Sequence, residues 1–384
     1  MNSEHEEPNW FEVADVAEIA SPSLLVYRHR VEENIKRMVG IAGGPARLRP
    51  HIKTHKMREP IDLQRRAGIT KFKCATIAEA ELAAEAGVQD LLLAYQPVGP
   101  AAKRIVRLAQ LFPGVQFSVL AGDATAIREL SRRIAELNKV RGTNGNELRS
   151  IDVLIDLDVG QHRTGAGPGK DAIELYRLLA EQPGLRPGGL HAYDGHLSEP
   201  DPVKRRAACE AAFAPVAGLR VKLEAEGLPV PRIVAGGTPT FRFHAQRGNV
   251  ECSPGTCVFW DAGYGSKLLD LEFVPAALVL TRVASKPGPR RLCLDLGHKA
   301  IASEMPHPRV KFLNLEDAQA VLHSEEHLVV ETDKGAEFKV GDCLYGLPWH
   351  ICPTVALHSE AIVIDQGKIA GCWKVASRDR RLTV

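Results

Sequence analysis

The feature that most constrains the fold is a repeated alternation of short apolar runs and charged amphipathic segments, from about residue 47 to residue 255. The apolar runs are ARLRPHIKTH, KFKCAT, DLLLAY, QFSVLA, SIDVLIDLD, GGLHAYD, RIVAGG and NVECSPG. Segments with helical spacing, such as IAEAELAAEAG, separate them. This alternation predicts an α/β fold with a parallel sheet, and eight strands in this length predict a (β/α)8 barrel. An open doubly wound sheet is the alternative, but no GxGxxG follows the first strand.

The rest of the chain has a different pattern. After about Leu268 the apolar runs are strand-like, as in PAALVLTRVASKP, RRLCLDLG, HLVVET and AIVIDQGKIAGCWKV, and convincing helical segments are missing from the sequence. We therefore expect a barrel domain over residues 25–265. Residues 1–24 and 266–384 are expected to form a second, β-rich domain.

Composition narrows the class of protein. The net charge of +2 is spread over 384 residues without basic blocks, which argues against a nucleic acid or a membrane surface as partner. No apolar run reaches the roughly 18 residues of a membrane span. The acidic start MNSEHEEPNW does not look like a signal peptide. Eight scattered cysteines indicate a reducing, cytoplasmic setting.

A lysine stands where a barrel carries its chemistry, at the carboxyl end of the first predicted strand. In LRPHIKTHK, Lys53 follows Arg49 and His51. Nearby positive charge and partial burial both lower the pKa of a lysine and make its amine nucleophilic. Such an amine suits a Schiff base with an aldehyde, of which pyridoxal 5'-phosphate (PLP) is the common one. The alternative is a lysine that simply points to solvent.

A phosphate group would need a second binding element. Gly236, Gly237 and Thr238 follow the seventh predicted strand, and Gly255 follows the eighth. Barrel phosphate sites are frequently built from these two loops. Tight turns without a ligand are the alternative reading of the same glycines.

Other polar residues follow the fifth and sixth strands. Arg163 could bind a phenolic oxygen or a carboxylate, or it could pair with Asp156 or Asp158. His191 or Tyr193 could stack on a flat ring, although His191 could equally be a core histidine.

A possible metal site lies near the C-terminus, in LPWHICPTVALH. His350 and Cys352 are two residues apart, so on a strand they would point to the same face. Imidazole and thiolate together suit Zn²⁺. Two protein ligands are too few for a structural site, so water or substrate would complete it. His327 is a possible third polar partner.

These motifs together resemble the D-threonine aldolase and D-serine dehydratase family, PLP enzymes with an alanine-racemase-like barrel and a β-domain. The resemblance covers nearly the whole chain, from SPSLLVYRHRVEENIKRM to WHIC, and RPHIKTHK is its most specific part. It implies that Lys53 forms the Schiff base and that Arg163 lies beside the cofactor. It assigns ring contacts to His191 and Tyr193, the phosphate to the GGTPT and SPGT loops, and a divalent metal to His350 and Cys352.

The resemblance leaves two reactions open, both on D-β-hydroxy amino acids. An aldolase would break the Cα–Cβ bond to give glycine and an aldehyde, and His196 is then a candidate base for the β-hydroxyl. A dehydratase would release a keto acid and ammonia. His-x-Cys resembles the zinc-using dehydratases, whereas some aldolases carry His-x-Asp and use harder ions such as Mn²⁺. We expect the divalent metal to be Zn²⁺, Mn²⁺ or Mg²⁺. HAYDGH, AGGTPTF and CSPGTCVFWD are closer to D-threonine aldolases, and we favour the aldolase.

Two further activities fit such a barrel less well. A non-catalytic PLP carrier usually lacks a β-domain and a metal pair. An amino-acid racemase would need a second acid or base, typically a tyrosine from the β-domain, and Tyr264 and Tyr345 do not lie in the expected motif. The resemblance also implies a homodimer.

Overall fold

The computed structural model describes residues 10–141 and 150–384, and these fall into two compact units. The first, here called the β unit, contains Met1–Ile35, Thr54–Glu59 and Thr256–Ala376. The second, the barrel unit, contains Lys36–Lys53, Pro60–Gly255 and Ser377–Val384. Of the predicted N-terminal segment 1–24, residues 1–9 lie outside the described part. The boundary at residue 265 stays a prediction.

The barrel unit contains a sheet of seven parallel strands that follow one another in chain order. Its strands are β2 (Lys71–Cys74), β3 (Asp90–Leu93), β4 (Gln116–Ala121), β5 (Ile151–Asp156), β6 (Leu185–Ala192), β7 (Ile233–Ala235) and β8 (Val250–Cys252). Residues 48–51 lie between the two edges of this sheet, because Leu48 forms a parallel bridge to Cys252 and His51 one to Lys73. The barrel predicted from the sequence is confirmed.

The first barrel strand is shorter than the sequence indicates. The run ARLRPHIKTH predicts a strand, but residues 45–47 and 52–54 form 3-10 turns and only isolated bridges lie between them. Pro50 has no N–H to donate to a ladder, which limits regular pairing. Three backbone hydrogen bonds remain, from Arg49 N to Cys252 O at 2.8 Å, from His51 N to Pro254 O at 2.8 Å and from Lys73 N to Pro50 O at 2.9 Å.

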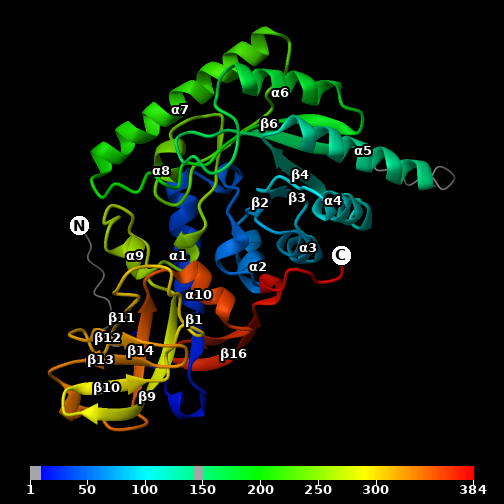
Figure 1. Cartoon of the computed structure of the whole chain (residues 1–384). Coiled ribbons are helices and arrows are strands. Elements are labelled where there is room, and N and C mark those ends of the chain that lie inside the picture. Colours follow the sequence, from blue (N-terminus) through cyan, green and yellow to red (C-terminus); the bar gives the residue numbers. More distant parts are fainter. Residues whose placement is uncertain (1–9, 142–149) are drawn as a thin grey trace. The chain divides into compact units, whose positions relative to one another are not determined.

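Helices alternate with these strands as predicted, and α3, α4 and α5 lie outside β2, β3 and β4 (Figure 1). The helices are α2 (Arg58–Arg66), α3 (Ile77–Glu85), α4 (Pro100–Leu111), α5 (Ala124–Arg141), α6 (Lys170–Glu181), α7 (Pro202–Ala225) and α8 (Phe241–His244). Local sequence sets their starts. The side chain of Thr76 caps α3 by accepting from Glu79 N, and Asp201 caps α7, which has proline at its first position.

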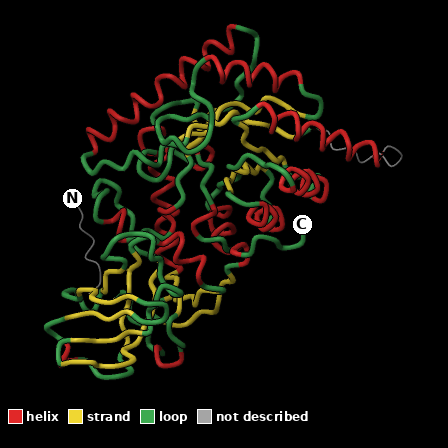
Figure 2. Tube along the Cα trace, in the orientation of Figure 1, coloured by secondary structure: helices red, strands yellow, loops and turns green. Residues whose placement is uncertain are grey.

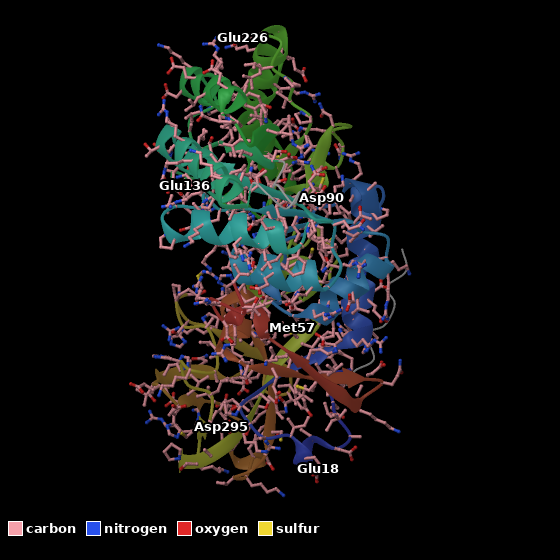
Figure 3. The ribbon with its side chains drawn as sticks, turned by 90° about the vertical axis from the view of Figure 1, so that its right-hand side faces the viewer. Glu18, Met57, Asp90, Glu136, Glu226 and Asp295 are labelled. Atoms are coloured by element: carbon pink, nitrogen blue, oxygen red, sulfur yellow. The ribbon has the colours of Figure 1, made fainter. Side chains whose placement is uncertain are left out.

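The interior of the barrel holds a paired arginine. Arg49 is 1% exposed, and its guanidinium donates to both oxygens of Asp90 at 2.7 and 3.0 Å and to Glu251 at 2.7 Å. Asp90 is labelled in Figure 3. Two carboxylates thus neutralise the positive charge that the sequence places close to Lys53, because a buried charge is tolerated only when it is paired.

The β unit is built on a nine-stranded sheet, with path order β12-β13-β10-β9-β1-β15-β16, and with β14 on β9 and β11 on β14. Residues after 276 form mainly strands and loops (Figure 2). The strands are β1 (Ser23–Tyr27), β9 (Ala277–Gly288), β10 (Arg291–Leu294), β11 (Val310–Phe312), β12 (Gln319–His323), β13 (Leu328–Glu331), β14 (Cys343–Pro348), β15 (Glu360–Asp365) and β16 (Lys368–Lys374). Its helices include α1 (Arg28–Ala42), which continues into the barrel unit, α9 (Ala262–Gly265) and α10 (Ile351–Leu357). No helix in the described residues has the length and apolar character needed to cross a membrane.

Candidate active site

The barrel unit contains a cavity of about 530 Å³ at the carboxyl ends of its strands. The following polar residues line it: His51, Lys53, Lys73, Gln96, Asp123, Asp156, Arg163, Thr164, His191 and Tyr193. Asp156 is the last residue of β5, and Tyr193 directly follows β6. Active sites of barrel enzymes lie at this end of the strands, so the cavity is the candidate active site.

Lys53 reaches this cavity from a short 3-10 turn, Ile52–Thr54, where its side chain is half-buried. Its Nζ lies 5.7 Å from the centre of the Tyr193 ring, and its backbone N donates to His51 Nδ1 at 3.2 Å. The guanidinium carbon of the exposed Arg163 lies 5.0 Å from the same ring centre. The structure therefore brings the predicted residues Lys53 and Arg163 together at the ring of a third, Tyr193.

A second lysine in the cavity did not stand out in the sequence. Lys73 on β2 is 2% exposed, and its Nζ lies 3.1 Å from His191 Nε2. His191 Nδ1 lies 2.7 Å from Asp156 Oδ1. Burial and, next, the positive charge of Lys53 lower the pKa of Lys73 to about 7. The signal was the run KFKCAT, in which two lysines alternate with apolar residues and so point to the same face of a strand.

The alternatives left open for Arg163 and His191 can now be compared with the observed contacts. Asp158 accepts from the backbone amides of Gly160 and His162 and from the His162 ring. Asp156 is occupied by His191 instead. Both ring nitrogens of His191 are engaged, and burial, followed by the charge of Lys73, lowers the pKa of this histidine. His191 is thus a buried side chain that is hydrogen-bonded to both Lys73 and Asp156 and also lines the cavity.

His196 lies on the loop after β6, exposed, with its Nε2 against the loop that follows β5. A Cβ on Gly160 would lie 3.4 Å from this nitrogen. The described lining of the cavity does not include His196. Its assignment as a base stays a prediction.

The predicted phosphate loops lie side by side. Gly255 N, after β8, donates to Thr238 Oγ1, after β7, at 3.2 Å. Gly236 has φ of +84°, and a Cβ there would lie 2.8 Å from a ring carbon of His244, so the position requires glycine. Gly237 N donates to Asp194 Oδ1 at 3.1 Å. The four predicted residues thus form one small region at the ends of β7 and β8.

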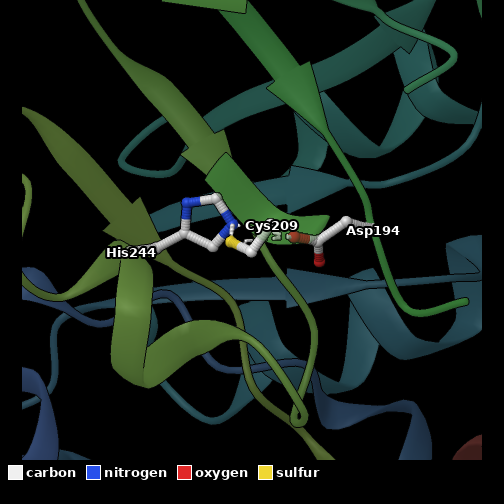
Figure 4. Close-up of side chains that lie close together, drawn as sticks. All are labelled: Asp194, Cys209 and His244. Atoms are coloured by element: carbon white, nitrogen blue, oxygen red, sulfur yellow. Dashed lines mark hydrogen bonds and ion pairs between the residues drawn. The ribbon is translucent and has the colours of Figure 1, made fainter. Parts of the chain in front are cut away.

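A buried cluster supports this region (Figure 4). Asp194 accepts from Thr240 Oγ1 at 2.6 Å and from His244 Nε2 at 2.8 Å, and Cys209 Sγ lies 3.4 Å from the same nitrogen. The ligand atoms of Asp194, Cys209 and His244 lie within 4.8 Å of one another, a spacing that could hold a metal ion. Their hydrogen bonds favour another role.

The protons of this cluster follow from its partners. Arg247 has only donors, and its guanidinium lies 3.1 Å from His244 Nδ1, so that nitrogen must accept. Nε2 of His244 therefore carries the proton of the ring and donates a hydrogen bond to Asp194. This nitrogen has no free lone pair with which to bind a metal. Burial raises the pKa of Cys209 to about 12, which keeps its thiol protonated. The cluster is best described as a hydrogen-bonded support for the Gly237–Thr240 turn.

The predicted metal pair lies in the β unit, and its local structure corrects the sequence analysis. His350 and Cys352 do not lie on a strand, because β14 ends at Pro348 and α10 begins at Ile351. Pro353 suits the first turn of a helix, where its missing N–H is not needed. Asp261 Oδ2 accepts from Ile351 N at 3.1 Å and caps this start. The two side chains nevertheless meet and form a hydrogen bond.

Carboxylates and hydroxyls surround this pair. His350 Nδ1 lies 2.5 Å from Glu304 Oε1, and Cys352 Sγ lies 3.2 Å from Thr54 Oγ1. Burial opposes charge on His350, but hydrogen bonding and charge from Cys352 and then Glu304 raise its pKa to about 9. An imidazole, a thiol and nearby carboxylates are a donor set that fits a divalent ion such as Zn²⁺. The exposed His327 lies between β12 and β13, and none of the contacts described for residues 10–141 and 150–384 joins it to this pair.

Comparison with known proteins places this fold and site in a family. The model described as "Alanine racemase, N-terminal domain" matches residues 26–262, and the one described as "Putative serine dehydratase domain" matches residues 276–364. The chain belongs to the family of proteins with an alanine-racemase-like N-terminal domain. The resemblance inferred from the sequence is confirmed.

Particular relatives narrow the comparison. A D-threonine aldolase of Arthrobacter sp is 30% identical over 94% of each chain. A 3-hydroxy-D-aspartate aldolase of Paracoccus denitrificans is 31% identical over 95% of this chain and 94% of the relative. The crystal structure of D-threonine aldolase from Filomicrobium marinum superposes with a TM-score of 0.86 at 27% identity, covering 94% of this chain and 97% of that one.

Proposed function

We propose that the protein is a PLP- and divalent-metal-dependent lyase that cleaves D-β-hydroxy-α-amino acids to glycine and an aldehyde. The observation that carries this proposal is the cavity in which Lys53, Lys73 and Arg163 surround the Tyr193 ring. The relatives that match over nearly the whole chain are named as aldolases for substrates of this class.

The residues present fit PLP. Lys53 supplies an amine for the aldehyde group, and Tyr193 offers an aromatic surface next to that amine. Three cationic side chains suit a ligand that carries several negative charges. We assign its phosphate to the Gly236–Thr238 loop and Gly255, which lie outside the described lining of the cavity, and Asp194 holds this turn in place. When bound, PLP supplies an electron sink for the pair of electrons left on Cα.

The cleavage requires two proton transfers, one from the β-hydroxyl and one to Cα, and side chains of the protein must carry them out. The β-hydroxyl loses its proton to a base, for which His196 is our candidate, and the Cα–Cβ bond breaks. The β-carbon leaves as an aldehyde, and Cα keeps the electron pair and takes up a proton to give glycine. Lys53 is the group we assign to hold the cofactor before and after each turnover.

His350 and Cys352 would hold a divalent ion, which would supply Lewis-acid chemistry for the β-hydroxyl of the substrate. Glu304 contacts Nδ1 of His350, which leaves Nε2 as the nitrogen available for a metal. Zn²⁺, Mn²⁺ and Mg²⁺ remain the candidate ions, and the thiol favours Zn²⁺.

A dehydratase is the second candidate function. Two observations favour it, the His-x-Cys pair and the match of residues 276–364 to a serine dehydratase domain. In this reaction Cα loses its proton, hydroxide leaves Cβ, and hydrolysis gives a keto acid and ammonia.

We also infer a cytoplasmic homodimer. All eight cysteines are free thiols, which suits a reducing compartment. The homodimer rests on the family resemblance alone, and sedimentation equilibrium of the purified protein measures it directly.

Product analysis tests the function. The purified protein is incubated with PLP, D-threonine or L-threonine, and Zn²⁺, Mn²⁺ or Mg²⁺, with a Lys53→Ala variant as the matched control. Glycine and acetaldehyde in equal amounts, from the D-isomer only and absent in the variant, are the expected result. 2-Oxobutyrate and ammonia would replace the aldolase by the dehydratase. 3-Hydroxy-D-aspartate is assayed in the same way, with glycine and glyoxylate as its aldolase products and oxaloacetate and ammonia as its dehydratase products. The absence of aldolase and dehydratase products from both substrates would overturn the proposal.

A further inference from the structure

Lys73 is a buried amine in the cavity to which the sequence analysis assigned no role. It is 2% exposed yet lines the cavity, so its amine lies at the deep end, whereas Arg163 is exposed. Its Nζ lies 5.6 Å from the centre of the Tyr193 ring, almost the same separation as for Lys53. The charged and titratable groups that face it are Lys53, Asp156, Asp194, Arg49 and His191.

The hydrogen bonds around His191 fix what Lys73 can offer. Asp156 can only accept from His191 Nδ1, so that nitrogen carries the proton of a neutral imidazole. Nε2 then has the lone pair, and Lys73 must donate to it. As an ammonium, Lys73 keeps two further N–H groups for the cavity.

The ammonium group of Lys73 has no direct hydrogen bond to an anion among the described residues. In the described residues, the hydrogen-bond partner of Lys73 is a neutral ring, and Lys53 adds a like charge. A buried ammonium is costly unless an anion binds it directly. The pKa of Lys73, lowered to about 7 by burial and by Lys53, expresses this cost. An anionic ligand atom in the cavity would remove it.

We propose that Lys73 binds the phenolic oxygen of the cofactor. This inference rests on the proposed function. On the PLP ring the phenolic oxygen and the aldehyde group are on adjacent carbons, so its partner must lie close to the Schiff-base lysine. Lys73 meets this condition because its Nζ and that of Lys53 lie 5.6 and 5.7 Å from the centre of the same Tyr193 ring.

The pH titration of the cofactor's absorbance tests the assignment. A cation beside the phenolic oxygen stabilises its negative charge and so lowers the pKa of the neighbouring imine on Lys53. We expect Lys73→Met and Lys73→Gln to raise the midpoint of this titration by about 1 to 3 pH units, and Lys73→Arg to restore most of it. Glutamine can still donate to His191, so the Lys73→Gln variant separates loss of charge from loss of the hydrogen bond.

Lys71→Met is the matched control, because Lys71 lies two residues earlier on the same strand and pairs with Glu251 at 2.8 Å. Its midpoint should equal that of the wild type. An unchanged midpoint in both Lys73 variants, or a shift that appears in Arg163→Met instead, would refute the role of Lys73 alone. Wild-type protein that forms no absorbing adduct with PLP would refute the proposed function itself, and this inference with it.

Discussion

Asp194→Asn is the sharpest test of the support beneath the phosphate loop. Asp194 is 2% exposed and accepts four hydrogen bonds, from Gly237 N, Thr240 Oγ1, His244 Nε2 and, at 3.8 Å, Cys209 Sγ. Asparagine has nearly the same shape and keeps one oxygen, which can still accept from the turn. Its amide group then faces the N–H of His244, donor against donor.

The cost follows from the loss of acceptors. His244 cannot escape by moving its proton to Nδ1, because that nitrogen accepts from Arg247. The variant therefore loses the hydrogen bond from His244 to a charged group, and the weaker one from the Cys209 thiol, and it leaves the buried N–H of His244 without that acceptor. Together these changes are expected to lower the free energy of unfolding by about 2 to 4 kcal/mol. Asp379→Asn, at an exposed position, is the control and should change it by less than about 0.5 kcal/mol.

Urea unfolding can assign this loss to the barrel unit. The four tryptophans, Trp10, Trp260, Trp349 and Trp373, all belong to the β unit, so their fluorescence reports that unit. Far-ultraviolet circular dichroism follows the helices, most of which lie in the barrel unit. We expect the dichroism midpoint of Asp194→Asn to fall at an unchanged slope. A midpoint equal to that of Asp379→Asn would refute the hydrogen-bond argument.

Three further results are expected. Lys53→Ala should abolish the absorbance of the bound cofactor at about 420 nm, and a variant that keeps it would remove Lys53 as the anchor. Chelation should abolish activity and leave the cofactor bound, and Zn²⁺ should restore activity to the wild type but not to His350→Ala or Cys352→Ala; full activity in a metal-free sample would contradict the Lewis-acid role. Burial lowers the pKa of His55 to about 3, so this histidine stays neutral in the folded protein while it takes up a proton below pH 6.5 in the unfolded chain. The contribution of neutral His55 to the free energy of unfolding is therefore complete above pH 6.5 and is lost as the pH falls toward 3. Between pH 8 and pH 5 the tryptophan-monitored stability should therefore fall by about 2 kcal/mol more in the wild type than in His55→Asn, which keeps an acceptor for Met57 N; equal slopes would contradict this assignment.

The sequence predicted the parts of the site that depend on chain order. Strands of a parallel barrel all end at the same rim, so a residue just after a strand reaches that rim whatever its neighbours are. Lys53, Arg163 and Tyr193 could be placed together for this reason, and so could the loops that carry Thr238 and Gly255. The prediction required only the periodicity of strands and helices.

Secondary structure at the metal pair could not be predicted in the same way. The spacing of His350 and Cys352 suits one face of a strand, and Pro353 was the local signal for a helix start instead. The cap that fixes this start comes from Asp261, which lies 90 residues earlier than the amide it accepts from. A contact between residues so far apart in the chain does not affect the local hydrophobic periodicity, so the sequence pattern cannot predict it.

By itself, the sequence determined a (β/α)8 barrel with a β-rich second part, and a lysine at the carboxyl end of the first barrel strand. These features follow from local hydrophobic periodicity and from the order of the strands. Only the tertiary structure decided which polar groups pair inside the barrel. Lys73 meets His191 across 118 residues, and Asp194 meets His244 across 50. Burial removes water as a partner, so each of these groups takes the nearest donor or acceptor that barrel closure provides.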